Sequence, residues 1–132
     1  MYRRLPLVLC LSALTACGAS DRRDVEKVLN VRAESLAAGD AARYLTVISR
    51  TYQDKGKDFA AKRSELEASL KPPYGVSYRA LNRVITIDGD HATATGSYLM
   101  KISRTGNPLE LVGEEAIRLR REPGGWKIVG GL

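Results

Sequence analysis

The chain has 132 residues, which suits one domain and is too short for two. Hydrophobic residues make up 44% and charged residues 27%, a balance typical of a globular protein rather than a disordered one. The formal charge is +6, but the basic residues are scattered among acidic neighbours and form no stripe that would indicate nucleic-acid binding. A single histidine and two cysteines argue against a zinc site, and no motif indicates a cofactor.

The first 17 residues have the pattern of a bacterial export signal. Arg3 and Arg4 form a positive start, and an apolar run with two interruptions extends from Leu5 to Leu14. This run is too short for a bilayer, which needs about 20 apolar residues. Removal of the segment would lower the formal charge from +6 to +4 and would also remove Cys10.

The end of this run, Leu14-Thr15-Ala16-Cys17, resembles the lipobox of bacterial lipoproteins. The resemblance implies cleavage before Cys17 and acylation of that cysteine, which anchors the chain in a membrane. We therefore expect a signal peptide at 1–16, a lipidated cysteine and short tether at 17–21, and a domain at 22–132. In a Gram-negative host, Gly18 in place of Asp favours the outer membrane. The alternative is an ordinary signal peptide in which Cys17 is incidental.

The first half of the mature chain has helical spacing. Apolar residues recur from Val25 to Leu36, with Ser20 or Asp21 as the expected cap and Gly39 as the stop. A second helix is expected after the cap Asp40, with Tyr44, Leu45 and Ile48 on it, followed by a loop at 52–57. A third helix is expected after the cap Asp58, and Pro72-Pro73 would end it. Its apolar residues are Phe59, Leu66 and Leu70. Lys62, Arg63, Glu65 and Glu67 on this third helix have the pattern of a solvated face.

The second half alternates between apolar and polar residues, as β-strands do. Strands are expected at 76–87, 91–103, 109–121 and 126–130, joined by the turn sequences Asp88-Gly89, Thr105-Gly106-Asn107 and Pro123-Gly124-Gly125. The short connections predict an antiparallel meander. In the first strand the alternation breaks, which predicts a bulge near Asn82. The fold class is therefore α+β: three N-terminal helices packed on a curved four-stranded antiparallel sheet, in a cone-shaped, cystatin-like roll.

Three segments carry a resemblance to the nuclear transport factor 2-like superfamily, which includes SnoaL-like and ketosteroid-isomerase-like proteins. They are Leu36–Leu45, Ile87–Ala92 and Gly125–Gly130. The resemblance implies a pocket between the helices and the concave face of the sheet. It transfers no activity, since the superfamily contains isomerases, dehydratases, hydrolases and non-catalytic domains. The isomerases have a tyrosine donor on the first helix, whereas here the inward positions carry apolar residues.

Two residues are candidates for chemistry in such a pocket. Glu115 shares the parity of Leu109, Leu111, Ile117 and Leu119 on the third strand and is the one charged residue among these apolar positions. Desolvation there would raise its proton affinity and suit it to act as a general base. Alternatively, a bulge at Gly113 turns it outward, or an arginine or tyrosine satisfies it structurally. Tyr98 on the neighbouring strand could donate a hydrogen bond into the pocket, or could be a core residue.

Three further residues complete the candidate pocket. Tyr52 and Asp54 fall at its expected rim, where loop capping is the alternative interpretation. Trp126 is a candidate lining residue that would equally suit the core.

The sequence thus supports two functions. The first is an envelope lipoprotein that binds a small apolar ligand or an envelope protein without catalysis. The second is a cavity enzyme of isomerase, cyclase or hydrolase type that uses Glu115 as its base. A homodimer formed through the curved sheet is a further possibility.

Overall fold

A computed structural model describes residues 14–71, 75–103 and 107–132 of the chain. The expected signal segment up to residue 13, the Pro72-Pro73 stop and most of the 105–107 turn lie outside the described residues. The elements are α1 (Leu14–Ala38), α2 (Ala41–Leu45), β1 (Gln53–Asp54), β2 (Lys57–Asp58), α3 (Phe59–Ser69), β3 (Gly75–Asp88), β4 (His91–Ser103), β5 (Pro108–Glu122) and β6 (Gly125–Gly130). Strands β3 to β6 form one antiparallel sheet in sequence order, which confirms the predicted α+β class.

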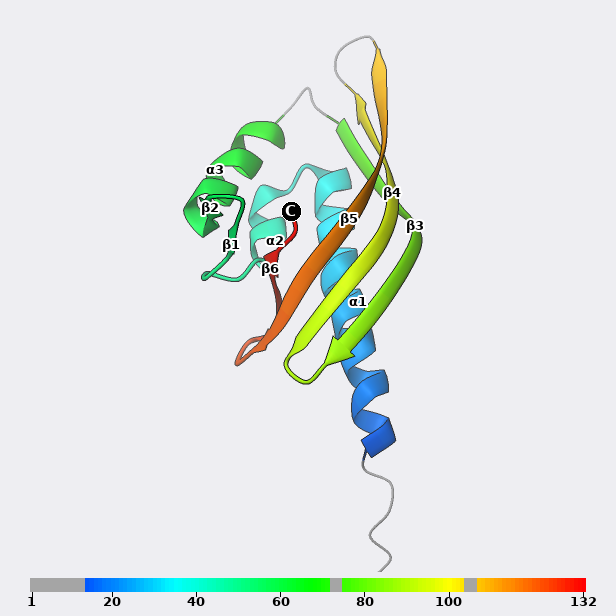
Figure 1. The fold of residues 1–132 in the computed structure, drawn as a ribbon. Coiled ribbons are helices and arrows are strands. Elements are labelled where there is room, and N and C mark those ends of the chain that lie inside the picture. Colours follow the sequence, from blue (N-terminus) through cyan, green and yellow to red (C-terminus); the bar gives the residue numbers. More distant parts are fainter. Residues whose placement is uncertain (1–13, 72–74, 104–106) are drawn as a thin grey trace, which may run out of the picture.

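The sheet curves around α1, while α2, α3 and the β1–β2 hairpin lie beside its β6 edge (Figure 1). Strand β6 pairs only with the Arg118–Glu122 part of β5. Along the rest of β5 the edge that faces away from β4 has no partner strand among the described residues. The free edge of β5 therefore borders the space between the sheet and the hairpin.

Helix α1 begins earlier than the sequence predicted. It already includes Leu14 and continues through Ser20 and Asp21, so neither residue caps it, and residues 18–21 of the expected tether are helical. Asp21 instead forms an ion pair with Arg121 at 2.7 Å, and Arg22 donates to the carbonyl of Ile85 at 3.0 Å. These contacts fasten the start of the helix to the sheet.

Three predicted helix boundaries are confirmed: the end of the first helix at Gly39 and the caps at Asp40 and Asp58. Gly39 has a positive φ of 65° after α1. Asp40 and Asp58 each accept a hydrogen bond from a backbone N–H three residues ahead, which is the usual geometry of an N-cap. The prediction for Ile48 was wrong: α2 has only five residues, and Ile48 lies beyond it in a parallel bridge with Ile128.

The bulge predicted near Asn82 is present, because the β3–β4 register shifts between Ala80 and Asn82. Opposite it, Gly96 approaches the β3 backbone so closely that a Cβ would lie 1.7 Å from the carbonyl oxygen of Asn82. The bulge changes which residues of β3 face inward. Before it Tyr78 pairs with Met100, and after it Arg83 and Ile85 pair with Gly96 and Ala94, so that all of them face the helices.

The core lies between the helices and the inner face of the sheet. All the buried core residues of the described chain lie between Val25 and Ile128, so residues 18–132 contain the complete described core. The predicted solvated face of α3 was wrong at Lys62, whose side chain is 7% exposed and pairs with Glu65 at 3.3 Å. Its aliphatic stem packs inward while the ammonium group reaches a carboxylate at the surface.

Candidate functional site

An open cleft of about 550 Å³ lies along the free edge of β5, on the side of the β1–β2 hairpin. The helix α1 contributes Arg32, and the sheet contributes Tyr98, Met100 and Glu115. The remaining lining residues come from the hairpin, from β5 and from the end of the chain: Asp54, Lys55, Glu114, Ala116, Arg118, Gly131 and Leu132. Asp54, Tyr98 and Glu115 of the five predicted residues therefore line one cleft.

Glu115 lies inside this cleft with its side chain only 9% exposed. The β4–β5 register runs without a shift past Gly113, so no bulge turns the side chain outward. Its Oε2 lies 3.5 Å from Arg32 Nη1, and its Oε1 lies 3.7 Å from Arg83 Nη2 and accepts a hydrogen bond from the Tyr78 hydroxyl. Two guanidinium groups and one phenol thus surround the carboxylate.

The aromatic rings tie this cluster together. The guanidinium of Arg32 lies 4.5 Å from the centroid of the Tyr78 ring, and Tyr78 stacks on Tyr98 with centroids 5.8 Å apart. Arg32 Nε donates to the Tyr44 hydroxyl at 2.8 Å, and Arg83 Nη2 donates to the Tyr78 hydroxyl at 3.0 Å. The cluster formed by Arg32, Arg83, Glu115 and Tyr78, here called the arginine–glutamate cluster, connects α1, β3 and β5.

Burial and charge alter the titration of these groups. Burial raises the pKa of the Tyr78 hydroxyl, and its hydrogen bond to Glu115 adds to the effect. Burial also raises the pKa of Tyr44, although Arg32 opposes it. Burial opposes the charged form of Arg32, but Tyr44 and Glu115 outweigh this and raise the pKa of Arg32. Both tyrosines and the arginine are therefore protonated at neutral pH.

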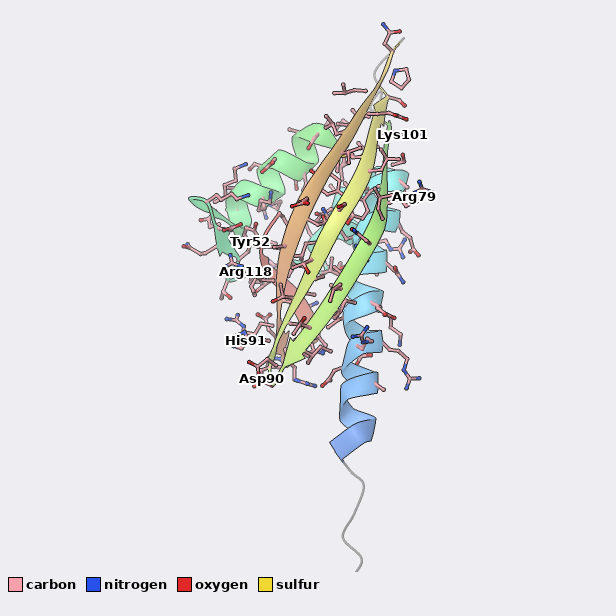
Figure 2. The ribbon with its side chains drawn as sticks, turned by 45° about the vertical axis from the view of Figure 1, so that its right-hand side comes forward. Tyr52, Arg79, Asp90, His91, Lys101 and Arg118 are labelled. Carbon is pink, nitrogen blue, oxygen red and sulfur yellow. The ribbon has the colours of Figure 1, made fainter. Side chains whose placement is uncertain are left out.

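The mouth of the cleft is held by a second polar group. Asp54 accepts a hydrogen bond from the Gly131 backbone at 2.9 Å and forms an ion pair with Arg118 at 3.2 Å. The Gly131 hydrogen bond and Arg118 lower the pKa of Asp54. Figure 2 shows Arg118 on the side of β5 that faces the hairpin, with Asp90 and His91 at the far end of the sheet. Asp54 therefore fixes the chain end as one wall of the cleft.

The structure does not bring the other two predicted residues to this cleft. Tyr52 is 1% exposed in the core, and its hydroxyl bonds the backbone of Leu132 behind the cleft wall. Trp126 is buried beside the β5–β6 turn and borders a different cavity, together with Lys27 and Val47. Both pack the structure that supports the cleft and do not line it.

Within the described residues, no group of three or more His, Cys, Asp or Glu side chains is placed to hold a metal ion. Across the same residues, no helix combines the length and the apolar character that crossing a membrane requires.

The family model of the SnoaL-like domain matches residues 16–130, which is most of the chain. The chain belongs to the SnoaL-like domain family. No curated protein matches the sequence.

Solved structures show the same nuclear transport factor 2-like fold. A candidate scytalone dehydratase from Novosphingobium aromaticivorans has a TM-score of 0.76 and 16% identity, over 88% of this chain and 84% of its own. A candidate dehydratase of the nuclear transport factor 2-like family from Streptomyces avermitilis has a TM-score of 0.74 and 13% identity, over 86% and 94%. A nuclear transport factor 2-like superfamily protein from Salmonella enterica serovar Typhimurium has a TM-score of 0.71 and 15% identity, over 85% of this chain and 88% of its own. At these identities the likeness shows the fold alone.

The sequence interpretation of this SnoaL-like domain missed Arg32, Tyr78 and Arg83. Arg32 lies four residues before Leu36 and three after Leu29, so it interrupts the apolar stripe of α1. A charge within such a stripe is the signal that could have identified it. Tyr78 and Arg83 face inward together only because the bulge lies between them, and alternation alone cannot place a bulge to the residue.

Proposed function

We propose that this SnoaL-like domain binds a small apolar ligand in the cleft along β5, without catalysis, while anchored to a membrane of the cell envelope. The observation that carries the proposal is the cleft itself, about 550 Å³ in volume, whose lining combines Tyr98, Met100, Ala116 and Leu132 with six charged side chains. Pockets for small molecules have volumes of this order, and polar groups in them orient the ligand.

The setting of Glu115 supports binding over catalysis. A general base needs a lone pair that is free to accept a substrate proton. The Oε1 atom of Glu115 already accepts from Tyr78, and Arg32 and Arg83 stabilise the negative charge from two sides. The carboxylate is therefore suited to hold α1 and the sheet together at the cleft.

The test of binding uses the neutral fluorescent probe 1-N-phenylnaphthylamine with residues 18–132. Binding in the cleft predicts saturable fluorescence enhancement with one site per chain. Replacement of Met100 by Glu puts a charge on the apolar wall and should weaken the binding of the probe. Arg63→Glu, on the exposed face of α3, should leave the binding of the probe unchanged. An absence of saturable binding would contradict the proposal and favour an envelope protein as the partner.

A cavity enzyme is the second candidate, and one observation favours it: Glu115 and Tyr98 line the same cleft. A base and a hydrogen-bond donor at one carbonyl compound are the elements of proton abstraction. The test is exchange of α-protons of small apolar ketones in D2O, followed by NMR. Exchange that is abolished by Glu115→Gln, but not by Glu114→Gln, would support the enzyme and contradict a purely binding role.

The proposed membrane anchor is the lipidated Cys17 at the end of the lipobox, which would lie close to the folded domain. Cleavage before Cys17 leaves only four residues ahead of the Asp21–Arg121 ion pair, and α1 is helical through them. A helix of four residues rises about 6 Å. The end of the sheet near the β3–β4 and β5–β6 turns would thus face the membrane closely (Figure 1).

Anchoring is tested by metabolic labelling with a radioactive fatty acid and by membrane fractionation. The full-length protein should carry label and sediment with membranes, in the outer membrane if the host is Gram-negative. Cys17→Ser should lose both properties, whereas Cys10→Ser, which changes the other cysteine, should keep them. Labelling that survives Cys17→Ser would contradict the assignment of the anchor.

A second copy of the chain is the proposed partner of the outer sheet face. Val84 and Val112 point away from the helices and are 62% and 72% exposed. Lys101 and Glu110 on the same face offer charges of both signs, as a self-complementary two-fold interface requires. Light scattering should give twice the chain mass, and Val112→Arg should reduce it to a monomer. A wild-type monomer at high concentration would contradict the homodimer.

A further inference from the structure

The arginine–glutamate cluster carries an excess positive charge beside the cleft. Arg32 and Arg83 contribute two positive charges and Glu115 one negative charge, which leaves a net charge of +1. Arg32 and Glu115 each have side chains only 9% exposed, and that of Arg83 is 20% exposed. Burial of an uncompensated charge is costly, so a site of this kind favours a ligand that brings the opposite charge.

Arg32 also has unused hydrogen-bonding capacity. A guanidinium has five N–H donors. Among the described residues only its Nε–H has an acceptor, the Tyr44 hydroxyl, while Nη1 is buried without a hydrogen bond. The ion pair of Nη1 with Glu115 is long, at 3.5 Å. Because Arg32 lines the cleft, a ligand atom that accepts hydrogen bonds is the missing partner.

The apolar wall continues from this charge toward the tip of the sheet. Met100 lines the cleft, and Leu111 pairs with it on the same face. Leu111 and Leu109 are 41% and 55% exposed, since no helix covers this end of the sheet among the described residues (Figure 1). The cleft therefore offers a cation at one end and an uncovered apolar surface at the other.

We infer that the ligand of this cleft is an apolar carboxylic acid, with its carboxylate at Arg32 and its hydrocarbon part along Met100 and Leu111. This inference rests on the proposed function and names the ligand class. A carboxylate carries one negative charge, which neutralises the cluster, and its planar oxygens match the guanidinium fork. A doubly charged phosphate would leave an excess negative charge in its place.

The other charged side chains of the cleft balance one another, and in residues 18–132 the terminal carboxylate of Leu132 adds one negative charge at the wall of the cleft. Asp54 and Arg118 neutralise each other in their ion pair at the mouth. Lys55 and Glu114, one of each sign, also line the cleft, and both are exposed. Exposed charges are screened by water and salt, so the buried cluster dominates the selectivity for ligand charge.

The experiment compares decanoate with 1-decanol, which has the same chain but no charge, as competitors of 1-N-phenylnaphthylamine on residues 18–132. Decanoate should displace the probe at a concentration about tenfold or more below that of decanol, as a charge-assisted hydrogen bond implies. Equal displacement by the two would overturn the inference and leave the proposed function intact. Absence of probe binding would overturn the proposed function itself.

Variants separate the contact with Arg32 from the charge of the cluster. Arg32→Gln should raise the concentration of decanoate that displaces the probe to that of decanol, and it should leave the concentration needed for decanol unchanged. Arg83→Gln leaves the cleft lining intact but makes the cluster neutral. It should therefore weaken the binding of decanoate severalfold. Arg79→Gln is the matched control, because Arg79 is an exposed residue of the same strand that faces away from the helices. An equal loss in Arg79→Gln and Arg83→Gln would contradict the role of the cluster.

Discussion

Replacement of Glu115 by glutamine should destabilise the fold strongly, because it leaves two guanidinium groups without their shared anion. At an effective dielectric constant of about 20, pairs at 3.5 and 3.7 Å contribute about 4–5 kcal/mol of Coulombic attraction each. Part of this attraction only offsets the desolvation of the three charges, and loss of one partner of a buried pair typically costs about 3–5 kcal/mol. For a domain of this size the melting temperature should fall by about 10–20 °C.

The assay is thermal unfolding of residues 18–132, followed by circular dichroism at neutral pH. Glu114→Gln is the matched control, since it removes the same charge from the neighbouring residue, which is exposed on the opposite face of β5. Its effect should stay within about 0.5 kcal/mol. If Glu115→Gln and Glu114→Gln melt at the same temperature, Glu115 does not hold the cluster together.

Three further changes test other parts of the structure. Gly96→Ala should destabilise the chain by about 2 kcal/mol or more, because its Cβ would meet the backbone of Asn82 at the bulge, and chemical denaturation would measure this. Asp54 has a lowered pKa in the folded chain. The stability that its carboxylate contributes is therefore present above the pKa that this group has in the unfolded chain, and it is lost as the pH falls below that value toward the folded pKa. Asp54→Asn should remove part of the acid sensitivity seen in unfolding curves. Tyr78 has a raised pKa, so its contribution is complete below about pH 10 and is lost as the pH rises further. Near-ultraviolet absorbance titration should show Tyr78 among the late-titrating tyrosines, together with Tyr44 and Tyr52, and Tyr78→Phe should remove one of them. Titration of all tyrosines together would contradict the bond to Glu115.

The strands were predictable because their signals are local. Alternation and turn residues placed each strand of the sheet within about one or two residues, and the irregular parity of β3 indicated its bulge. The caps Asp40 and Asp58 were predictable for the same reason, since each bonds a backbone N–H only three residues away. Short-range patterns therefore sufficed for the fold class.

The errors arose where tertiary contacts decide the local structure. Ser20 and Asp21 have good capping side chains, but the contacts of Asp21 and Arg22 with the sheet lie inside a longer helix. Ile48 fits the spacing of a helix, yet it pairs with Ile128 eighty residues later. Lys62 was expected in solvent from its charged neighbours, yet its side chain is only 7% exposed. For Asp21, Arg22 and Ile48 the partner lies far away in the sequence.

The site was only partly predictable for a similar reason. Parity alone placed Glu115 and Tyr98 on the inner face of the sheet, and both line the cleft. The groups that surround Glu115 come from α1 and from both sides of the β3 bulge, so their meeting depends on the packing of α1 against the sheet. When the sequence alone is considered, these surrounding groups are not visible, and a single inward glutamate is then interpreted as a catalytic base.

The most direct test of ligand binding in the cleft is a two-dimensional ¹⁵N–¹H NMR titration of residues 18–132 with 1-N-phenylnaphthylamine. Binding in the cleft predicts that the amide signals of Tyr98, Met100, Glu115 and Leu132 shift together and saturate, while those of α3 outside the cleft stay in place. Saturable shifts confined to the outer face of the sheet, around Val84 and Val112, or no shifts at all, would contradict it.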